Sequence, residues 1–253
     1  MPFTFSHPFI ILPFAKLEKG WVSLTGLTVG SIVPDFEYFI RMDIKSSHGH
    51  TLGGLFYFDF PLGILLCFVF HNLIRNSLIK NLPTTWQRKF FKFTYFEWNS
   101  FFLRNWNLVL LSLFIGIVSH FLLDSFTNKE GFFVTLIPFL KKQYVYNDLP
   151  LFFHQILYYI ISVSGLIMII YTGWQMPAHR RVRPSKPSVS YWLTIVMVTI
   201  GSFFLFVHLK TNDYMLSLYK AFFANFLIIA ITSFIVGLFL TSLIFINQGR
   251  NNR

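Results

Sequence analysis

The 253-residue chain has a single cysteine, Cys67, and only ten Asp and Glu residues against 21 Lys and Arg. One cysteine excludes a disulfide within the chain and a zinc site built from several thiolates. The sequence also has no Gly-x-Ser-x-Gly, HExxH or CxxC motif and no phosphate-binding glycine loop followed by lysine. These absences exclude the most common signatures of serine hydrolases, zinc proteases and nucleotide-binding enzymes.

Charged residues make up only 12% of the chain, whereas hydrophobic residues make up 54% and aromatic residues 20%. The apolar residues lie in blocks of about 20, the length of helix that crosses the hydrocarbon core of a bilayer. We therefore predict an all-α, polytopic helical membrane protein with about five transmembrane helices. The expected spans are residues 55–75, 106–126, 151–174, 189–209 and 217–246.

Two segments outside these spans are predicted to lie at the membrane surface. Residues 21–33 are short, rich in small residues and stopped by Pro34, which is typical of a re-entrant or interfacial helix. Residues 84–104 mix basic and aromatic residues as interfacial helices do, although a plain amphipathic connector has the same pattern. The N-terminal residues lack the basic start of a secretory signal, so we expect them to be retained.

A basic stretch with three prolines, residues 176–188, is the clearest break in composition. It separates the ionisable residues at membrane depth from a plainer C-terminal part. The sequence therefore predicts a metal-site membrane domain at 1–174, a basic linker at 175–188, a transmembrane helical pair at 189–246 and a polar tail at 247–253.

The formal net charge of +11 resides mainly in connections between the apolar blocks. With five spans, twelve Lys and Arg lie on the side of the C-terminus and nine on the other side. By the positive-inside rule, this difference favours a cytoplasmic C-terminus. We expect membrane lipids with anionic head groups, and not nucleic acid, to be the partners of these charges.

Two ionisable residues, His120 and Asp124, lie at the end of the second predicted span. Positions i and i+4 share one face of a helix, so both side chains can point at one spot. An ionised Asp at membrane depth costs about 2.5–3.5 kcal/mol, and a cation bound by both residues would offset that cost. The alternatives are a plain His–Asp hydrogen bond, or exposure of the pair at the membrane interface, since residue 126 is close to the predicted helix end.

Further ligands must come from elsewhere, because catalytic zinc typically takes three protein ligands. Asp35 and Glu37 follow a proline, although Asp35 can instead cap the next helix. His50 lies on a Gly-rich stretch, and His7 precedes a proline that is also typical of a helix start. With five spans, all these residues lie on the same side as the end of the second span.

Several motifs in this order resemble an uncharacterised bacterial membrane family, a domain-of-unknown-function group with the same N-terminal signature. The motifs are MPFTFSHP, VGSIVPDFEYF, HTLGGLFYFDFPLG, SHFLLDSFTNKEG and DLPLFFHQILYYIISVSG. More distantly, the chain is similar to the YdjM-like membrane-bound metal-dependent hydrolases and to zinc-dependent phospholipases C. That resemblance implies these metal ligands or immediate neighbours of the metal: His7, Asp35, His50, His120 and Asp124. Relatives usually have histidine where this chain has Asn128, which puts a ligand role for that position in doubt.

We expect a divalent metal, zinc first and manganese or magnesium next, in a hydrolase that acts on a lipid or lipid-linked ester or phosphoester. Glu37 or Asp35 would accept the proton from the attacking water. The alternative is a non-enzymatic transporter or assembly factor whose His–Asp pairs join helices or relay protons. The expected location is the bacterial inner membrane.

Overall fold

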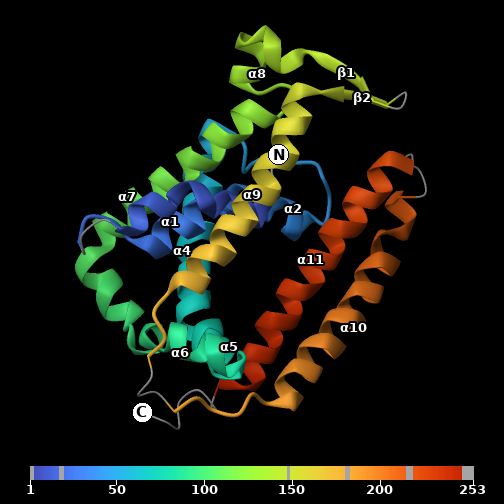
Figure 1. Cartoon of the computed structure of the whole chain (residues 1–253). Helices are drawn as coiled ribbons and strands as arrows, with labels where there is room; N and C mark the ends of the chain where they lie inside the picture. Colours follow the sequence, from blue (N-terminus) through green and yellow to red (C-terminus); the bar gives the residue numbers. More distant parts are fainter. Residues whose placement is uncertain (1–2, 17–19, 147–148, 180–182, 215–218, 247–253) are drawn as a thin grey trace. The chain divides into compact units, whose positions relative to one another are not determined.

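A computed structural model describes residues 3–16, 20–146, 149–179, 183–214 and 219–246 (Figure 1). Five helices are long and apolar enough to cross a membrane, by length and composition. Their bounds are Leu52–Asn81, Trp98–Leu136, Phe153–Gln175, Val189–Lys210 and Ala224–Ile244. The prediction of an all-α polytopic protein with about five transmembrane helices is therefore confirmed.

The chain forms two compact units, and the first consists of Met1–Asp35, His48–Ile64 and Phe102–Gln175. Its elements are η1 (Thr4–Lys16), α1 (Leu24–Gly30), η2 (Val33–Asp35), α3 (Leu52–Gly54), η3 (Leu55–Asp59), most of α7 (Trp98–Thr127), α8 (Phe132–Leu136), η6 (Pro138–Lys141), β1 (Gln143–Tyr146), β2 (Leu149–Phe152) and α9 (Phe153–Gln175). β1 and β2 pair as an antiparallel hairpin.

The second unit consists of Phe36–Ser47, Leu65–Phe101 and Met176–Arg253. Its elements are α2 (Phe36–Arg41), η4 (Phe70–Ile74), α5 (Arg75–Asn81), α6 (Thr84–Phe90), η5 (Phe91–Tyr95), α10 (Val189–Tyr214) and α11 (Tyr219–Ile244), and α4 (Phe60–Val69) is divided between the units. The domain limits predicted from composition stay a prediction.

Both segments predicted to lie at the membrane surface contain short helices. α1 begins after Ser23, whose side chain accepts a hydrogen bond from the Gly26 N–H at 3.2 Å, and it ends before Pro34. α6 and η5 fold the first part of residues 84–104, and α7 already begins at Trp98. Their contact with a membrane surface stays a prediction.

Small residues let α1 cross α7 at close range. A side chain on Gly30 would overlap the carbonyl oxygen of Leu113 and would lie 3.0 Å from the Cα of Gly116. The backbone N–H of Ser23 also donates to the hydroxyl of Ser112 at 2.8 Å. Such small-residue contacts are typical of helices that pack in membranes, and this crossing fixes the N-terminal segment against α7.

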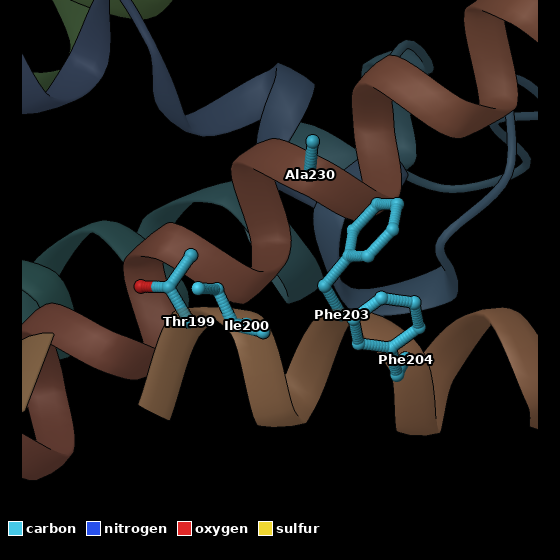
Figure 2. Close-up of a pocket in the computed structure, with 5 residues that line it drawn as sticks. All are labelled: Thr199, Ile200, Phe203, Phe204 and Ala230. Carbon is cyan, nitrogen blue, oxygen red and sulfur yellow. The ribbon is translucent and has the colours of Figure 1, made fainter. Parts of the chain in front are cut away.

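The second unit contains the pair α10 and α11 and a cavity between them (Figure 2). The cavity is lined by Thr199, Ile200, Phe203, Phe204 and Ala230. None of these five side chains is a titratable group or a common metal ligand.

Candidate metal centre

The α7 helix contributes His120 and Asp124, one turn apart on its buried face. His120 is fully buried and Asp124 is 6% exposed, and the His120 Nε2 atom lies 3.5 Å from Asp124 Oδ2. Their spacing places them on one face, as the sequence predicts. Asp124 is three residues before the end of α7 at Thr127.

The close crossing of α1 and α7 sets the orientation of His120. Its Nδ1 atom donates to the backbone carbonyl of Ser31 at 2.9 Å. Because Nδ1 carries the proton in this arrangement, the lone pair of Nε2 points away from Ser31 and can bind a cation. Metal-binding histidines usually have this kind of support on the second ring nitrogen.

The N-terminal segment η1 brings His7 to the same place. The His7 ring stacks on the His120 ring with centroids 4.1 Å apart. Its Nδ1 donates to the Thr4 carbonyl at 3.2 Å, and its Nε2 lies 3.4 Å from Asp124 Oδ1. His7 is fully buried, so residues 117 positions apart meet away from water.

Asp35 ends the short helix η2 directly after Pro34 and is 1% exposed. The hydroxyl of Thr4 donates to Asp35 Oδ2 at 2.6 Å, which fixes the carboxylate. The other oxygen, Oδ1, lies 3.5 Å from His120 Nε2 and 3.6 Å from His50 Nε2. Asp35 therefore faces the histidines with one oxygen and Thr4 with the other.

His50 approaches from the loop that precedes α3. Its Nε2 lies 3.5 Å from Asp124 Oδ2 and 3.4 Å from His120 Nε2. A side chain on the preceding Gly49 would lie 2.5 Å from the Pro34 carbonyl oxygen, so this close approach of the loop requires glycine. The His50 side chain is 21% exposed, which makes it the accessible member of the group.

Two triangles of atoms have the separations of neighbouring metal ligands, and they share the Nε2 atoms of His50 and His120. Asp124 Oδ2 completes one triangle and Asp35 Oδ1 the other, with every side between 3.4 and 3.6 Å. A tetrahedral cation with ligands at about 2.1 Å has neighbouring ligands about 3.4 Å apart. The same separations are too long for good hydrogen bonds.

The carboxylate oxygens of these two triangles share a second feature of metal ligands. Asp35 Oδ1 and Asp124 Oδ2 are buried and have no hydrogen-bond donor in the described part of the chain. Buried polar atoms nearly always have a hydrogen-bond partner. Two carboxylate oxygens that lack a donor and face two imidazole nitrogens are therefore suited to bind an ion. Two carboxylates with neutral histidines also balance the charge of one divalent cation.

The electrostatics of the group favour positive charge. Burial raises the pKa of Asp35, but the nearby His120, His50 and His7 outweigh burial, so the net pKa is below the ordinary value. Burial lowers the pKa of His50, but the Asp124 and Asp35 carboxylates outweigh it and raise the pKa to about 9. The two carboxylates thus favour positive charge on the groups that face them.

Comparison with known proteins identifies the chain's family. A domain of unknown function, DUF4184, matches residues 1–244. The chain belongs to the DUF4184 family. No curated protein and no solved structure matches it. The family match agrees with the resemblance to a domain-of-unknown-function group, and the more distant similarity to metal-dependent hydrolases stays a prediction.

The structure therefore brings together all five side chains for which the DUF4184 sequence predicts metal binding: His7, Asp35, His50, His120 and Asp124. They form two overlapping groups that can hold a metal ion, one with His7, Asp35 and His120 and one with His50, His120 and Asp124. Metal binding itself stays a prediction.

Glu37, the other predicted proton acceptor, belongs to neither group. Its Oε1 accepts from Arg41 Nη1 at 3.1 Å and from the backbone N–H of Ser47 at 2.9 Å, and its Oε2 accepts from the Ser46 hydroxyl at 2.6 Å. These contacts join α2 to the loop that follows it. The catalytic role of Glu37 stays a prediction, and its observed partners are those of a structural carboxylate.

Other polar residues near these motifs have separate partners in the DUF4184 chain. His48 is on the same loop as His50, but its Nδ1 lies 2.7 Å from the hydroxyl of Tyr57. Asn128 is exposed at the end of α7. Sequence reasoning missed Thr4, which holds Asp35, and Ser31, which holds His120. The carbonyl of Ser31 leaves no signal in the sequence, whereas Thr4 lies within the MPFTFSHP motif.

Proposed function

We propose that this DUF4184 protein binds one divalent cation, zinc before manganese or magnesium, and hydrolyses an ester or phosphoester of a membrane lipid. The observation that carries the proposal is the set of 3.4–3.6 Å distances that joins the Nε2 atoms of His50 and His120 to each other, to Asp124 Oδ2 and to Asp35 Oδ1. Imidazole and carboxylate ligands without a thiolate suit these metals. His7, which faces Asp124 Oδ1 at 3.4 Å, is the fifth proposed ligand.

The bound cation would polarise the ester or phosphoryl oxygen and acidify a water molecule. Three ligands, His50, His120 and Asp124, already equal the number typical of catalytic zinc. Asp35 Oδ1 is then available as a fourth ligand or as the group that accepts a proton from the attacking water. We prefer Asp35 to Glu37 in this role because three neighbours already donate hydrogen bonds to the Glu37 carboxylate.

A lipid is the proposed substrate because the ligands lie at the end of an apolar helix. Asp124 is within one turn of the end of α7, which together with α8 forms the apolar stretch Trp98–Leu136. Access would come from the His50 side, since the other ligands are buried. We further propose a bacterial inner membrane, from the resemblance to a bacterial membrane family, and a cytoplasmic C-terminus, from the distribution of Lys and Arg.

The metal content of purified protein tests the first part of the proposal. Elemental analysis of the detergent-purified protein should find one zinc or manganese per chain, and the double variant His120→Ala, Asp124→Ala should lose it. His154→Ala is the matched control, since this buried imidazole donates to the Leu140 carbonyl at 3.1 Å and belongs to neither ligand group. Equal metal content in the wild type and the double variant would refute metal binding by this group.

Hydrolysis of simple probes tests the second part. Bis(p-nitrophenyl) phosphate reports phosphoester cleavage and p-nitrophenyl butyrate reports ester cleavage, each before and after removal of the metal with a chelator. Activity on one probe that disappears with the metal and returns with zinc or manganese supports a hydrolase. Activity that survives chelation would refute the metal-dependent mechanism.

One observation favours a second candidate, a non-enzymatic membrane protein with a structural metal. Closed sites with four protein ligands are typical of structural zinc, and Asp35 supplies the fourth ligand here. The ion would then fasten the N-terminal segment and the His50 loop to α7. In that case metal removal lowers the unfolding temperature, and neither probe is hydrolysed at any metal concentration.

A further inference from the structure

The connection between α7 and α9, residues 131–152, has a well-packed inner face. We call it the cap segment; it contains α8, η6 and the β1–β2 hairpin (Figure 1). The Phe133 ring stacks on Phe126 of α7 with centroids 4.1 Å apart. Val134 is fully buried and Leu140 is 6% exposed. The cap segment is thus fixed to the end of α7 by its own apolar side chains.

The other end of the cap segment is fixed to α9. The Phe139 and Phe153 ring centroids are 4.4 Å apart, and the Phe153 N–H donates to the Lys142 carbonyl at 3.0 Å. The buried His154 donates to the carbonyl of Leu140. Since both ends and the inner face are packed, the remaining side chains cannot turn inward without breaking these contacts.

Those remaining side chains are mostly large and apolar. Phe132, Leu136 and Val145 are each more than 60% exposed, and Phe139 is 50% exposed. Ile137 and Tyr144 extend the same group. An apolar group of this size on a short surface segment favours contact with a partner or a membrane.

Positive charges accompany this apolar group. Lys129, Lys141 and Lys142 are exposed, and Glu130 is the one acidic residue among residues 129–146. The Nζ of Lys142 lies 5.5 Å from the centroid of the Tyr144 ring, so charge and aromatic surface are adjacent. Exposed aromatic residues beside lysines are typical of the boundary between hydrocarbon and lipid head groups.

Continuity with the spans decides what covers this surface. The cap segment directly joins two apolar helices that can cross a membrane, and α8 lies within the first of them, Trp98–Leu136. That stretch, α7 and α8 with a turn at residues 128–131, has 39 residues, whereas about 20 cross the hydrocarbon core. Its last residues therefore extend past the length that hydrocarbon needs, so a lipid surface is the expected neighbour of the cap segment.

We propose that the cap segment rests on the bilayer as an interfacial platform, with Phe132, Leu136 and Phe139 among the acyl chains. Its Lys141 and Lys142 and the neighbouring Lys129 then lie on anionic phospholipid head groups. Phe126, to which the cap segment is packed, is two residues after Asp124. The platform thus sets the depth of the α7 end that carries Asp124, at the level of the head groups. This proposal holds whether or not a cation is bound.

Spin labels on single cysteines test the platform. Cys67 is the only cysteine, so a Cys67→Ser background accepts one nitroxide label at Phe132→Cys, Leu136→Cys or Phe139→Cys. The full-length protein is reconstituted in phosphatidylcholine vesicles with or without phosphatidylglycerol. Relaxation of each label by oxygen, which concentrates in hydrocarbon, is compared with relaxation by a water-soluble nickel chelate.

Two further labels serve as references, one for exposure to hydrocarbon and one for exposure to water. Ile167→Cys lies in the middle of α9 on a side chain that is 60% exposed, and Lys186→Cys lies in the exposed basic linker. We expect the three platform labels to resemble Ile167→Cys in oxygen exposure and to be shielded from nickel. Replacing Lys129, Lys141 and Lys142 with Gln should raise nickel exposure in the vesicles that contain phosphatidylglycerol.

Two results would overturn the platform. Labels that match Lys186→Cys in both lipid mixtures would place this surface in water. Labels shielded from both oxygen and nickel would show that protein covers it, and dipolar broadening between labels would identify a second copy of the chain. All labelled positions are on the surface, so a helical circular dichroism spectrum like that of the unlabelled protein confirms folding in each case.

Discussion

Replacing Gly30 with Ala should weaken metal binding without touching a ligand. The added methyl group would overlap the carbonyl oxygen of Leu113 and lie 3.0 Å from the Cα of Gly116 and the backbone nitrogen of Ile117. Carbon atoms in good contact are about 3.5–4.0 Å apart, so α1 must move away from α7. Overpacking of this kind costs about 1–3 kcal/mol of stability.

The displacement reaches the metal centre through the next residue along the chain. Ser31 follows Gly30, and its carbonyl accepts the His120 Nδ1–H at 2.9 Å. Loss of such support on a metal-binding histidine typically lowers metal affinity about 10–100-fold. We therefore expect zinc affinity, measured by competition with a chromophoric chelator in detergent, to fall by that factor in the Gly30→Ala variant, together with its unfolding temperature.

Gly201→Ala is the matched control, since nothing lies within 4 Å of the added methyl group in α10. It should keep the zinc affinity and gain up to about 1 kcal/mol of helix stability. If Gly30→Ala fails to fold, Ser112→Ala loosens the same crossing more gently by removing the acceptor of the 2.8 Å bond from Ser23. Zinc affinities equal to wild type in both variants would refute the claim that the crossing orients His120.

Three other substitutions give separate tests of the site. His50→Ala should lower zinc affinity at least about 100-fold, as expected for one of four ligands, whereas His48→Ala on the same loop should leave it unchanged; equal effects in the chelator competition would contradict the assignment. Thr4→Val removes the 2.6 Å hydrogen bond to Asp35 and should lower zinc affinity about 10-fold, and an unchanged affinity would show that this hydroxyl is dispensable. Glu37→Gln should lower stability by about 1–3 kcal/mol in thermal unfolding while zinc content stays at one per chain, and a loss of zinc at unchanged stability would place Glu37 in the site.

The spans and the His120–Asp124 pair could be predicted because they depend on local patterns. A block of about 20 apolar residues and an i, i+4 spacing act within one helix, and no distant contact is needed to read them. Five spans and one shared helix face followed directly from the sequence. The short strands of the cap segment were not predicted, since QYVY and LPLF are too brief to stand out beside apolar helices.

Local sequence patterns alone could not predict that His7, Asp35 and His50 lie next to His120 and Asp124. An arrangement of five spans places these residues on the same side of the membrane as the end of α7, so they can meet. The resemblance to metal-dependent hydrolases then identified which residues to expect. The geometry itself depends on backbone contacts, such as the glycine crossing of α1 and α7, that composition cannot show. For Glu37, a local signal did exist, because Arg41 follows at i+4 and an acid–base pair at this spacing commonly stabilises a helix.

The arrangement of the carboxylates argues for an ion more strongly than the count of ligands does. A cluster that served only to join segments would place a donor on every carboxylate oxygen, as Thr4 does for Asp35 Oδ2. Asp35 Oδ1 and Asp124 Oδ2 instead face the two imidazole nitrogens at 3.5–3.6 Å, which is too far for a good hydrogen bond and near enough to share one ion. Burying two carboxylates is costly unless positive charge accompanies them. Positive charge at this spot, from a protonated His50 or from the proposed cation, therefore offsets the cost of burying the two carboxylates.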